Sequence, residues 1–129
     1  MADATVRCPC LSGLTYGDCC GRLHTGTAIA QTAEQLMRSR FSAFAAGDAG
    51  YLLATWHPRS RPGELLLDPD TRWYRLDILA TRRGGPFETD GTVEFRAFYR
   101  HPNGNGTQHE VSRFAREGGR WLYLDGTAD

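Results

Sequence analysis

The sequence predicts an α+β domain with a small metal-binding segment in front of it. Two observations predict the domain: apolar residues recur at helical spacing between residues 32 and 56, and from residue 73 onward they alternate with polar residues. A third predicts the metal-binding segment, because all four cysteines lie between residues 8 and 20. The length of 129 residues suits one domain, and a hydrophobic content of 40% allows a packed core.

The charge and hydropathy of the chain argue against two classes of protein. The formal net charge is zero at neutral pH, which argues against a large nucleic-acid-binding surface. No apolar run approaches the ~18 residues that a membrane-spanning helix needs. The first seven residues lack the apolar stretch of a secretory signal, so we expect a cytoplasmic protein.

The four cysteines, Cys8, Cys10, Cys19 and Cys20, have the spacing of a metal site. A disulfide framework needs an oxidising compartment, and a bridge between the adjacent Cys19 and Cys20 would be strained. Structural zinc takes four tetrahedral ligands, often all thiolate, from short loops. We therefore predict a structural zinc ion bound by the four thiolates, with iron–sulfur or redox thiol chemistry as the alternatives.

His24 lies four residues after Cys20 and is an alternative fourth ligand. Four thiolates already complete the coordination shell, so we expect His24 to be an exposed or capping residue. A complete shell leaves no open position for substrate or water. The metal would then be structural, and it would stabilise a segment that is too short to have a core of its own.

The cysteine pattern, Cys-x-Cys followed by eight residues and Cys-Cys, resembles the SEC-C motif. This motif is a small zinc-binding module that is also found at the end of the translocation motor SecA. The resemblance implies a zinc knuckle, which we place at residues 1–26. The motif usually has glycine after its second cysteine, where this chain has Leu11; the departure changes the turn and none of the ligands.

Two helices are predicted after the knuckle. Residues 32–46 carry apolar side chains at helical spacing, begin with a threonine and a glutamine that form a capping box, and are followed by Gly47. Asp48 is predicted to cap a second, short helix that ends at His57, because Pro58 follows it.

Four strands are predicted after the helices, over residues 73–80, 93–99, 107–117 and 120–125. In the first strand, Tyr74, Leu76, Ile78 and Ala80 are expected to share one face. Gly118 and Gly119 connect the last two strands as a two-residue hairpin loop. Helices followed by a four-stranded meander predict an α+β arrangement in which the helices cover one sheet face.

The register of the last hairpin determines which side chains share a face. A two-residue loop pairs Ser112 with Asp125 and gives one face the residues Glu110, Ser112, Phe114, Arg116, Trp121, Tyr123 and Asp125. We expect this aromatic face to receive the helices. Its carboxylates would then lie in the helix–sheet interface, where they need Arg, Tyr or Trp partners or water in a cavity.

Two stretches, LMRSRFSAFAAGDAGYLLATWHP and HEVSRFAREGGRWLYLDG, resemble the YchJ-like family of bacterial proteins. That family combines a SEC-C motif with a domain similar to nuclear transport factor 2. The resemblance implies a cone at residues 27–129, in which a curved four-stranded antiparallel sheet wraps around the helices. Such a cone leaves a pocket open at one end.

Three functions are compatible with these features. We favour a non-enzymatic binding protein whose cone holds a small ligand or a protein segment of unknown identity. The alternative is an enzyme of the isomerase, dehydratase or hydrolase type, with His57, Glu110 or Asp125 as the general base. A weaker alternative is nucleic-acid binding through the knuckle. For either use of the cone, the expected pocket residues are Arg38, Arg40, Trp56, Glu110, Ser112, Tyr123 and Asp125.

Overall fold

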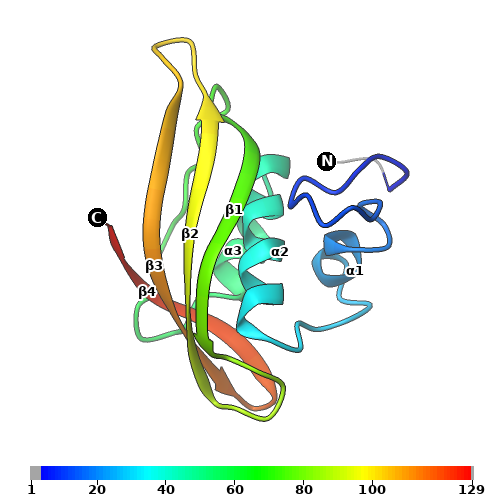
Figure 1. Ribbon diagram of the computed structural model, residues 1–129, viewed down its shortest axis with the longest axis vertical. Coiled ribbons are helices and arrows are strands. Elements are labelled where there is room, and N and C mark those ends of the chain that lie inside the picture. The colour runs from blue at the N-terminus through cyan, green and yellow to red at the C-terminus, as the bar shows by residue number, and fades with distance from the viewer. Residues whose placement is uncertain (1–3, 129) are drawn as a thin grey trace.

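The computed structural model describes residues 4–128, which form an antiparallel sheet with helices on one of its faces (Figure 1). The strands lie in the order β1-β2-β3-β4, with β1 at Arg72–Arg83, β2 at Asp90–Arg100, β3 at Gly106–Glu117 and β4 at Arg120–Ala128. The helices are α1 (Cys20–His24), α2 (Ala33–Ala46) and α3 (Ala49–Ala54). The predicted α+β class is confirmed. Residues 1–3 and 129, at the ends of the two predicted units, lie outside the described part.

The two predicted helices begin where their capping residues indicate, but the second ends at Ala54, three residues before the predicted end at His57. The Thr32 side chain accepts a hydrogen bond from the Gln35 backbone N–H at 3.0 Å, and α2 ends at Gly47, whose φ of 75° is left-handed. The Asp48 carboxylate accepts from the Tyr51 N–H at 3.0 Å and begins α3. The Gln35 side chain bonds the Gln31 N–H at 2.7 Å, so the reciprocal half of the capping box is displaced by one residue.

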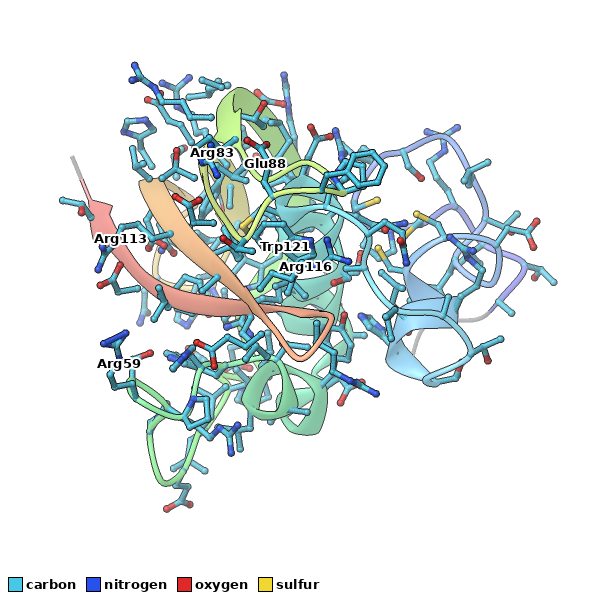
Figure 2. The ribbon with its side chains drawn as sticks, turned by 90° about the horizontal axis from the view of Figure 1, so that it is seen from below. Arg59, Arg83, Glu88, Arg113, Arg116 and Trp121 are labelled. Atoms are coloured by element: carbon cyan, nitrogen blue, oxygen red, sulfur yellow. The ribbon has the colours of Figure 1, made fainter. Side chains whose placement is uncertain are left out.

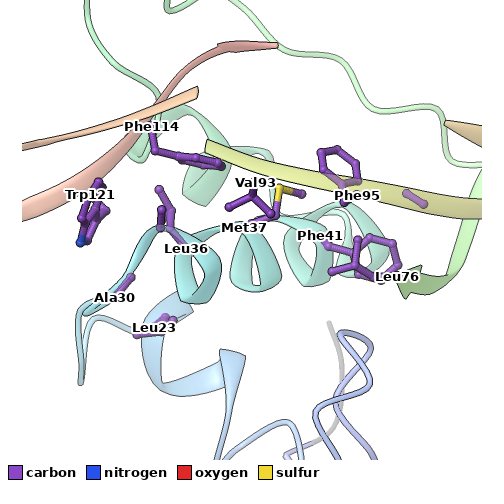
Figure 3. Packing of buried hydrophobic residues seen from close by; sticks show 12 residues of the cluster. Leu23, Ala30, Leu36, Met37, Phe41, Leu76, Val93, Phe95, Phe114 and Trp121 are labelled. Carbon is purple, nitrogen blue, oxygen red and sulfur yellow. The ribbon is translucent and has the colours of Figure 1, made fainter. Parts of the chain in front are cut away.

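The helix α2 is the central layer of the molecule. The sheet lies on one side of it, and the cysteine segment (residues 4–26, which include α1) lies on the other (Figure 1). On the sheet side, Leu36, Met37 and Phe41 pack in the core with apolar residues of the strands (Figure 3). Away from the sheet, the buried Ser39 and Ser42 contact the cysteine segment. Because α2 is buried on both sides, only small side chains such as serine fit where the cysteine segment approaches the helix.

The main core extends into the cysteine segment through Leu23 of α1. Its side chain is only 5% exposed and belongs to the same cluster as Leu36, Phe114 and Trp121. Figure 3 shows Leu23 across α2 from Phe114, so the core continues around the helix. The predicted boundary between residues 26 and 27 is therefore crossed by packing.

We expect a fragment of residues 27–129 to fold cooperatively but with lower stability than the full chain. Most of the helix–sheet core lies within the fragment, whereas loss of Leu23 uncovers one side of α2. Circular dichroism during thermal melting measures this difference. A fragment that is disordered at low temperature would show that the segment before residue 27 is an indispensable part of the core.

One predicted register is wrong. In β4, Asp125 pairs with Arg113, whereas Ser112 pairs with Gly126, because Leu124 forms a bulge after the Phe114–Tyr123 pair. The extra residue moves Asp125 to the outer sheet face, where both oxygens accept hydrogen bonds from the Arg113 guanidinium. Figure 2 shows Arg113 at the side of the sheet away from the helices.

A second bulge changes the assignment of the first strand. Trp73 pairs with Tyr99 and Arg75 pairs with Phe98, which leaves Tyr74 unpaired between them. Trp73 therefore packs against the core, while Tyr74 is exposed with the Arg100 guanidinium over its ring at 4.2 Å. The prediction that Tyr74 shares the inner face with Leu76 is wrong for this reason.

The segment after α3 pairs with the free edge of β4. The Tyr123 N–H donates to the Thr55 carbonyl and the His57 N–H donates to the Tyr123 carbonyl, each at 2.8 Å. These bonds place Trp56 beside Tyr123, with their rings 5.2 Å apart in an edge-on arrangement. Across the described residues, no helix has the length and apolar character needed to span a bilayer.

Candidate metal centre and interior cavity

The four cysteine sulfur atoms converge within 4.8 Å of one another. Cys10 Sγ lies 3.6 Å from Cys19 Sγ, which lies 3.9 Å from Cys20 Sγ. In a tetrahedral thiolate site with a zinc–sulfur distance of ~2.3 Å, sulfur atoms are ~3.8 Å apart. The cluster therefore has the donor set and the dimensions of a tetrahedral metal site.

A closed loop brings the two pairs of cysteines together. Its ends are joined where Arg7 pairs with Thr15 and where the Cys8 N–H donates to the Leu14 carbonyl at 2.9 Å. The chain then turns into α1, in which a Cβ on Gly21 would lie 2.6 Å from the Tyr16 carbonyl oxygen. Glycine at this position lets α1 approach the loop closely enough to complete the cluster.

The electrostatics of the cluster favour a bound cation. Hydrogen bonds with Cys10 and Cys8, together with burial, raise the pKa of the Cys20 thiol, because these neighbours disfavour a further negative charge. A dication removes that obstacle by stabilising all the thiolates. Polar contacts surround the cluster as well, since Ser12 donates to Cys19 Sγ at 3.1 Å and Ser42 lies 3.5 Å from Cys8 Sγ.

His24 is not part of the cluster, because both of its ring nitrogens bond elsewhere. Nε2 lies 2.8 Å from the Ser39 carbonyl and donates to it, so Nδ1 accepts the hydrogen bond of the Tyr16 hydroxyl. The ring also contacts Tyr51, at 4.5 Å between centroids. His24 thus connects the cysteine segment to α2 and α3.

We expect His24→Ala to leave the metal content unchanged and to destabilise the protein by about 2 kcal/mol, since two hydrogen bonds and a ring contact are lost. Metal analysis and denaturant unfolding of the same samples measure both quantities. Cys19→Ser is the matched comparison, because it removes a ligand and should release the metal. Loss of metal from the histidine variant would mean that the histidine is a ligand.

Leu11 has a left-handed backbone conformation, with a φ of 64°. It stands where the SEC-C pattern usually has glycine, and its side chain is 44% exposed. A left-handed conformation costs a non-glycine residue roughly 1–2 kcal/mol. The departure from the usual glycine therefore leaves the ligands in place and puts strain into the turn between them.

We expect Leu11→Gly to stabilise the protein by about 0.5–1 kcal/mol, because relief of the strain exceeds the greater entropy of glycine in the unfolded chain. Thermal melting of the metal-loaded protein measures the gain. Leu14→Gly is the control, since Leu14 is similarly exposed and its φ is not in the left-handed region. Equal destabilisation by both substitutions would contradict the argument.

A second feature is a cavity of about 220 Å³ between α2 and the sheet. Its apolar walls are formed by Met37, Phe41, Phe44, Trp73, Phe95 and Ala97. Its polar or mixed walls are formed by Arg40, Trp56, Gln108, Glu110, Ser112 and Tyr123. Five of the seven expected pocket residues therefore line it: Arg40, Trp56, Glu110, Ser112 and Tyr123.

The other expected residues lie elsewhere. Arg38 points toward the cysteine cluster, where it donates to the Cys10 carbonyl and to Glu34, each at 3.0 Å. Asp125 is displaced by the bulge to the outer face. His57, one of the three candidate general bases, is buried but bonds Glu117 at 2.7 Å and does not line the cavity.

Arg40 is the cation of the cavity and is only 3% exposed. Its Nη1 donates to the Leu52 carbonyl at 2.8 Å and to Thr55 Oγ1 at 2.7 Å. The guanidinium carbon lies 4.6 Å from the ring centroid of Tyr123 and 5.1 Å from that of Trp56. Burial lowers the pKa of Arg40 to about 10, so the side chain remains charged at neutral pH.

Glu110 is the carboxylate of the cavity, and its oxygens are bonded by neighbouring side chains. Oε2 accepts from Ser112 at 2.5 Å and from Tyr123 at 3.3 Å, while Oε1 accepts from Gln108 at 3.2 Å. A Cβ on Gly126 would lie 2.0 Å from Oε2, so glycine there leaves the space that the carboxylate occupies. Burial, followed by the charge of Glu110, raises the pKa of Tyr123.

The aromatic walls were not predicted as a site. Phe41, Phe44 and Phe95 have the periodicity of core residues, and side chains that line a cavity alternate in the same way as side chains that fill a core. Trp73 stood at the edge of the first predicted strand. No local signal in the sequence separates these two roles.

Two family models match the chain. One describes the SEC-C motif and matches residues 6–22; the other describes the middle, NTF2-like domain of YchJ and matches residues 32–126, more than half of the chain. The chain belongs to the YchJ-like family. Its cysteine cluster coincides with the SEC-C motif, which indicates metal binding, and the NTF2-like fold of its sheet and helices is confirmed.

Relatives of this YchJ-like chain match it over nearly all of its length. A UPF0225 protein of Corynebacterium glutamicum is 55% identical, covering 95% of this chain and 98% of the relative. A UPF0225 protein of Streptomyces coelicolor is 57% identical, covering 95% of each. A SEC-C motif-containing protein from Rhodopseudomonas palustris, solved in solution, has a TM-score of 0.80 at 36% identity and covers 95% of this chain and 98% of its own.

Proposed function

We propose that the protein binds a small organic ligand in the cavity between α2 and the sheet, and that a structural zinc ion stabilises the segment in front of α2. The main support for ligand binding is the cavity itself. Its walls are mostly aromatic and apolar, with a few polar groups, as is usual for ligand pockets. A protein whose cone served only as a scaffold would fill this space with side chains.

Zinc is the proposed metal because the donor set is four thiolates at tetrahedral spacing. Cys8, Cys10, Cys19 and Cys20 would complete its coordination shell, which leaves no position for a substrate. The cysteine residues lie across α2 from the sheet (Figure 1), whereas the cavity lies between α2 and the sheet. The role of the metal in this proposal is therefore to hold α1 and the preceding loop against the helix.

An enzyme on the same fold is the second candidate, and one observation favours it. Of the three candidate general bases, Glu110 alone lines the cavity, where Tyr123 and Arg40 could polarise a substrate. The hydrogen bonds that Glu110 already accepts from Ser112, Tyr123 and Gln108 support a role in ordering the wall. We therefore favour binding over catalysis.

The binding proposal is tested by NMR titration of the zinc-loaded protein with small aromatic compounds of different charge. Trp56 and Trp73 line the cavity, whereas Trp121 does not and its indole N–H bonds the Gln31 carbonyl at 3.2 Å. We expect saturable shifts of the indole signals of Trp56 and Trp73 and none of Trp121. Uniform small shifts, or no shifts with any compound, would refute binding in the cavity.

A further inference from the structure

We propose that the ligand is a small carboxylic acid with an apolar, planar body, and that its carboxylate binds Arg40. This inference rests on the proposed binding function of the cavity and names the class of ligand. Three observations support it: the bonding of the buried cation, the bonding of the nearby carboxylate, and the size and composition of the remaining walls.

Arg40 has hydrogen-bonding capacity that the protein does not use. Within residues 4–128, both of its hydrogen bonds leave from Nη1 and go to neutral acceptors, and it makes no ion pair. Nε and Nη2 therefore remain as donors on a side chain that lines the cavity. A buried guanidinium without a carboxylate partner is costly, and a bidentate carboxylate would satisfy it.

Glu110 is not the carboxylate partner of Arg40. Its two oxygens accept from Ser112, Tyr123 and Gln108, and it forms no salt bridge with Arg40. The two charges act on each other only through space, which slightly favours the charged form of Arg40. A ligand carboxylate could therefore bind Arg40 without displacing a hydrogen bond of Glu110. The negative charge of Glu110 would repel this carboxylate and weaken its binding.

A second unused donor lies beside Arg40. Among the described residues, the Trp56 indole Nε1–H is the buried side-chain polar group that has no hydrogen-bond partner. The Arg40 guanidinium lies over the same indole ring. The Trp56 nitrogen has almost no accessible surface, so the indole forms the wall beside Arg40 and the free Nε and Nη2 of Arg40 remain the donors for an anionic oxygen-bearing group.

The rest of the cavity suits an unsaturated or aromatic body of limited size. A volume of about 220 Å³ exceeds that of an apolar cavity of ~150 Å³ that is known to bind benzene. The rings of Phe41, Phe44 and Trp73 form much of this wall. Benzoate has suitable charge, shape and approximate size, and serves as a probe of the class.

The experiment compares benzoate with two isosteres, neutral benzamide and cationic benzamidine, by NMR titration of the zinc-loaded protein at millimolar concentrations. We expect benzoate to bind at least about tenfold more tightly than benzamide, since one desolvated charge-assisted contact contributes on this scale, and benzamidine to bind most weakly. Benzamide binding as tightly as benzoate, or benzamidine binding best, would overturn the anion assignment and leave cavity binding standing. No saturable shift with any of the three would overturn both.

Glu110→Gln provides a test that keeps Arg40 in place. Removal of the glutamate charge should tighten benzoate binding by about fivefold or more and weaken that of benzamidine, because the charge acts through a poorly solvated cavity. Glu34→Gln is the matched control, as it removes the same charge outside the cavity and should change neither affinity. Unchanged benzoate affinity in the Glu110 variant would contradict the proposal.

Arg40→Met tests the contact directly. The variant should bind benzoate no more tightly than benzamide, while benzamide affinity stays within about twofold of the original, because the apolar walls are unaltered. Retained preference for benzoate would show that another group binds the carboxylate. If the variant does not fold, the Glu110→Gln comparison decides the question.

Discussion

Removal of the metal by a chelator is expected to release residues 4–26 from α2 and to lower the free energy of unfolding by several kcal/mol. Structural zinc contributes about 10–16 kcal/mol of binding free energy in small zinc-finger peptides. Part of that energy reaches the domain here, because Cys8 contacts Ser42 and Leu23 belongs to the main core. Thermal melting before chelation, after chelation and after zinc is restored measures the effect.

The protein as purified should contain about one zinc ion per chain. Cys20→Ser should lose the metal and melt like the chelated protein. Ser12→Ala should retain it, because it removes the hydrogen bond to Cys19 Sγ and the one accepted from the Leu14 N–H but no ligand. The affinity should also fall as the pH falls, because protons compete with the metal for the thiolates. Iron in place of zinc, or a melting temperature that is insensitive to chelation, would contradict this prediction.

Leu23→Ala is expected to destabilise the whole protein by about 2–5 kcal/mol even when the metal remains bound, because it leaves a cavity in the main core. The leucine is 5% exposed and packs in the cluster that contains Leu36 and Trp121. Denaturant unfolding of the zinc-loaded variant, with metal analysis of the same sample, measures the loss.

The control for this substitution is Leu14→Ala. Leu14 lies in the cysteine loop as well but is 52% exposed, so its loss should cost less than about 0.5 kcal/mol. Similar small losses in both variants would mean that the cysteine segment and the sheet domain are energetically separate, and that the predicted division at residue 26 describes the energetics of the chain.

Local features of the sequence predicted the parts of the structure that depend on local chemistry. The cysteine spacing predicted the cluster of four thiols, Thr32 and Asp48 predicted the starts of α2 and α3, and the Gly118–Gly119 loop predicted the hairpin register as far as the Phe114–Tyr123 pair. Each of these depends on a few adjacent residues whose conformational preferences agree with the final fold.

Features that depend on tertiary packing were not predictable in the same way. The bulge at Leu124 has no local signature, and it alone changed the position of Asp125. Arg38 and Arg40 are two residues apart on one helix, and only the placement of the cysteine segment shows that the first points to the cysteine cluster and the second to the cavity. The sequence does not indicate which of the two arginine side chains contacts the cysteine segment and which lines the cavity.

The bulge at Leu124 makes the charge of the cavity depend on the length of β4. Deletion of this one residue would align Asp125 with Ser112 again and turn its carboxylate toward the helices, on the side where Glu110 already lies. The interior would then hold two acids and one arginine, although no side chain had been exchanged. Chains of this architecture can thus acquire or lose an interior acid by a single-codon insertion or deletion, a route to altered ligand preference that substitution scanning would never sample.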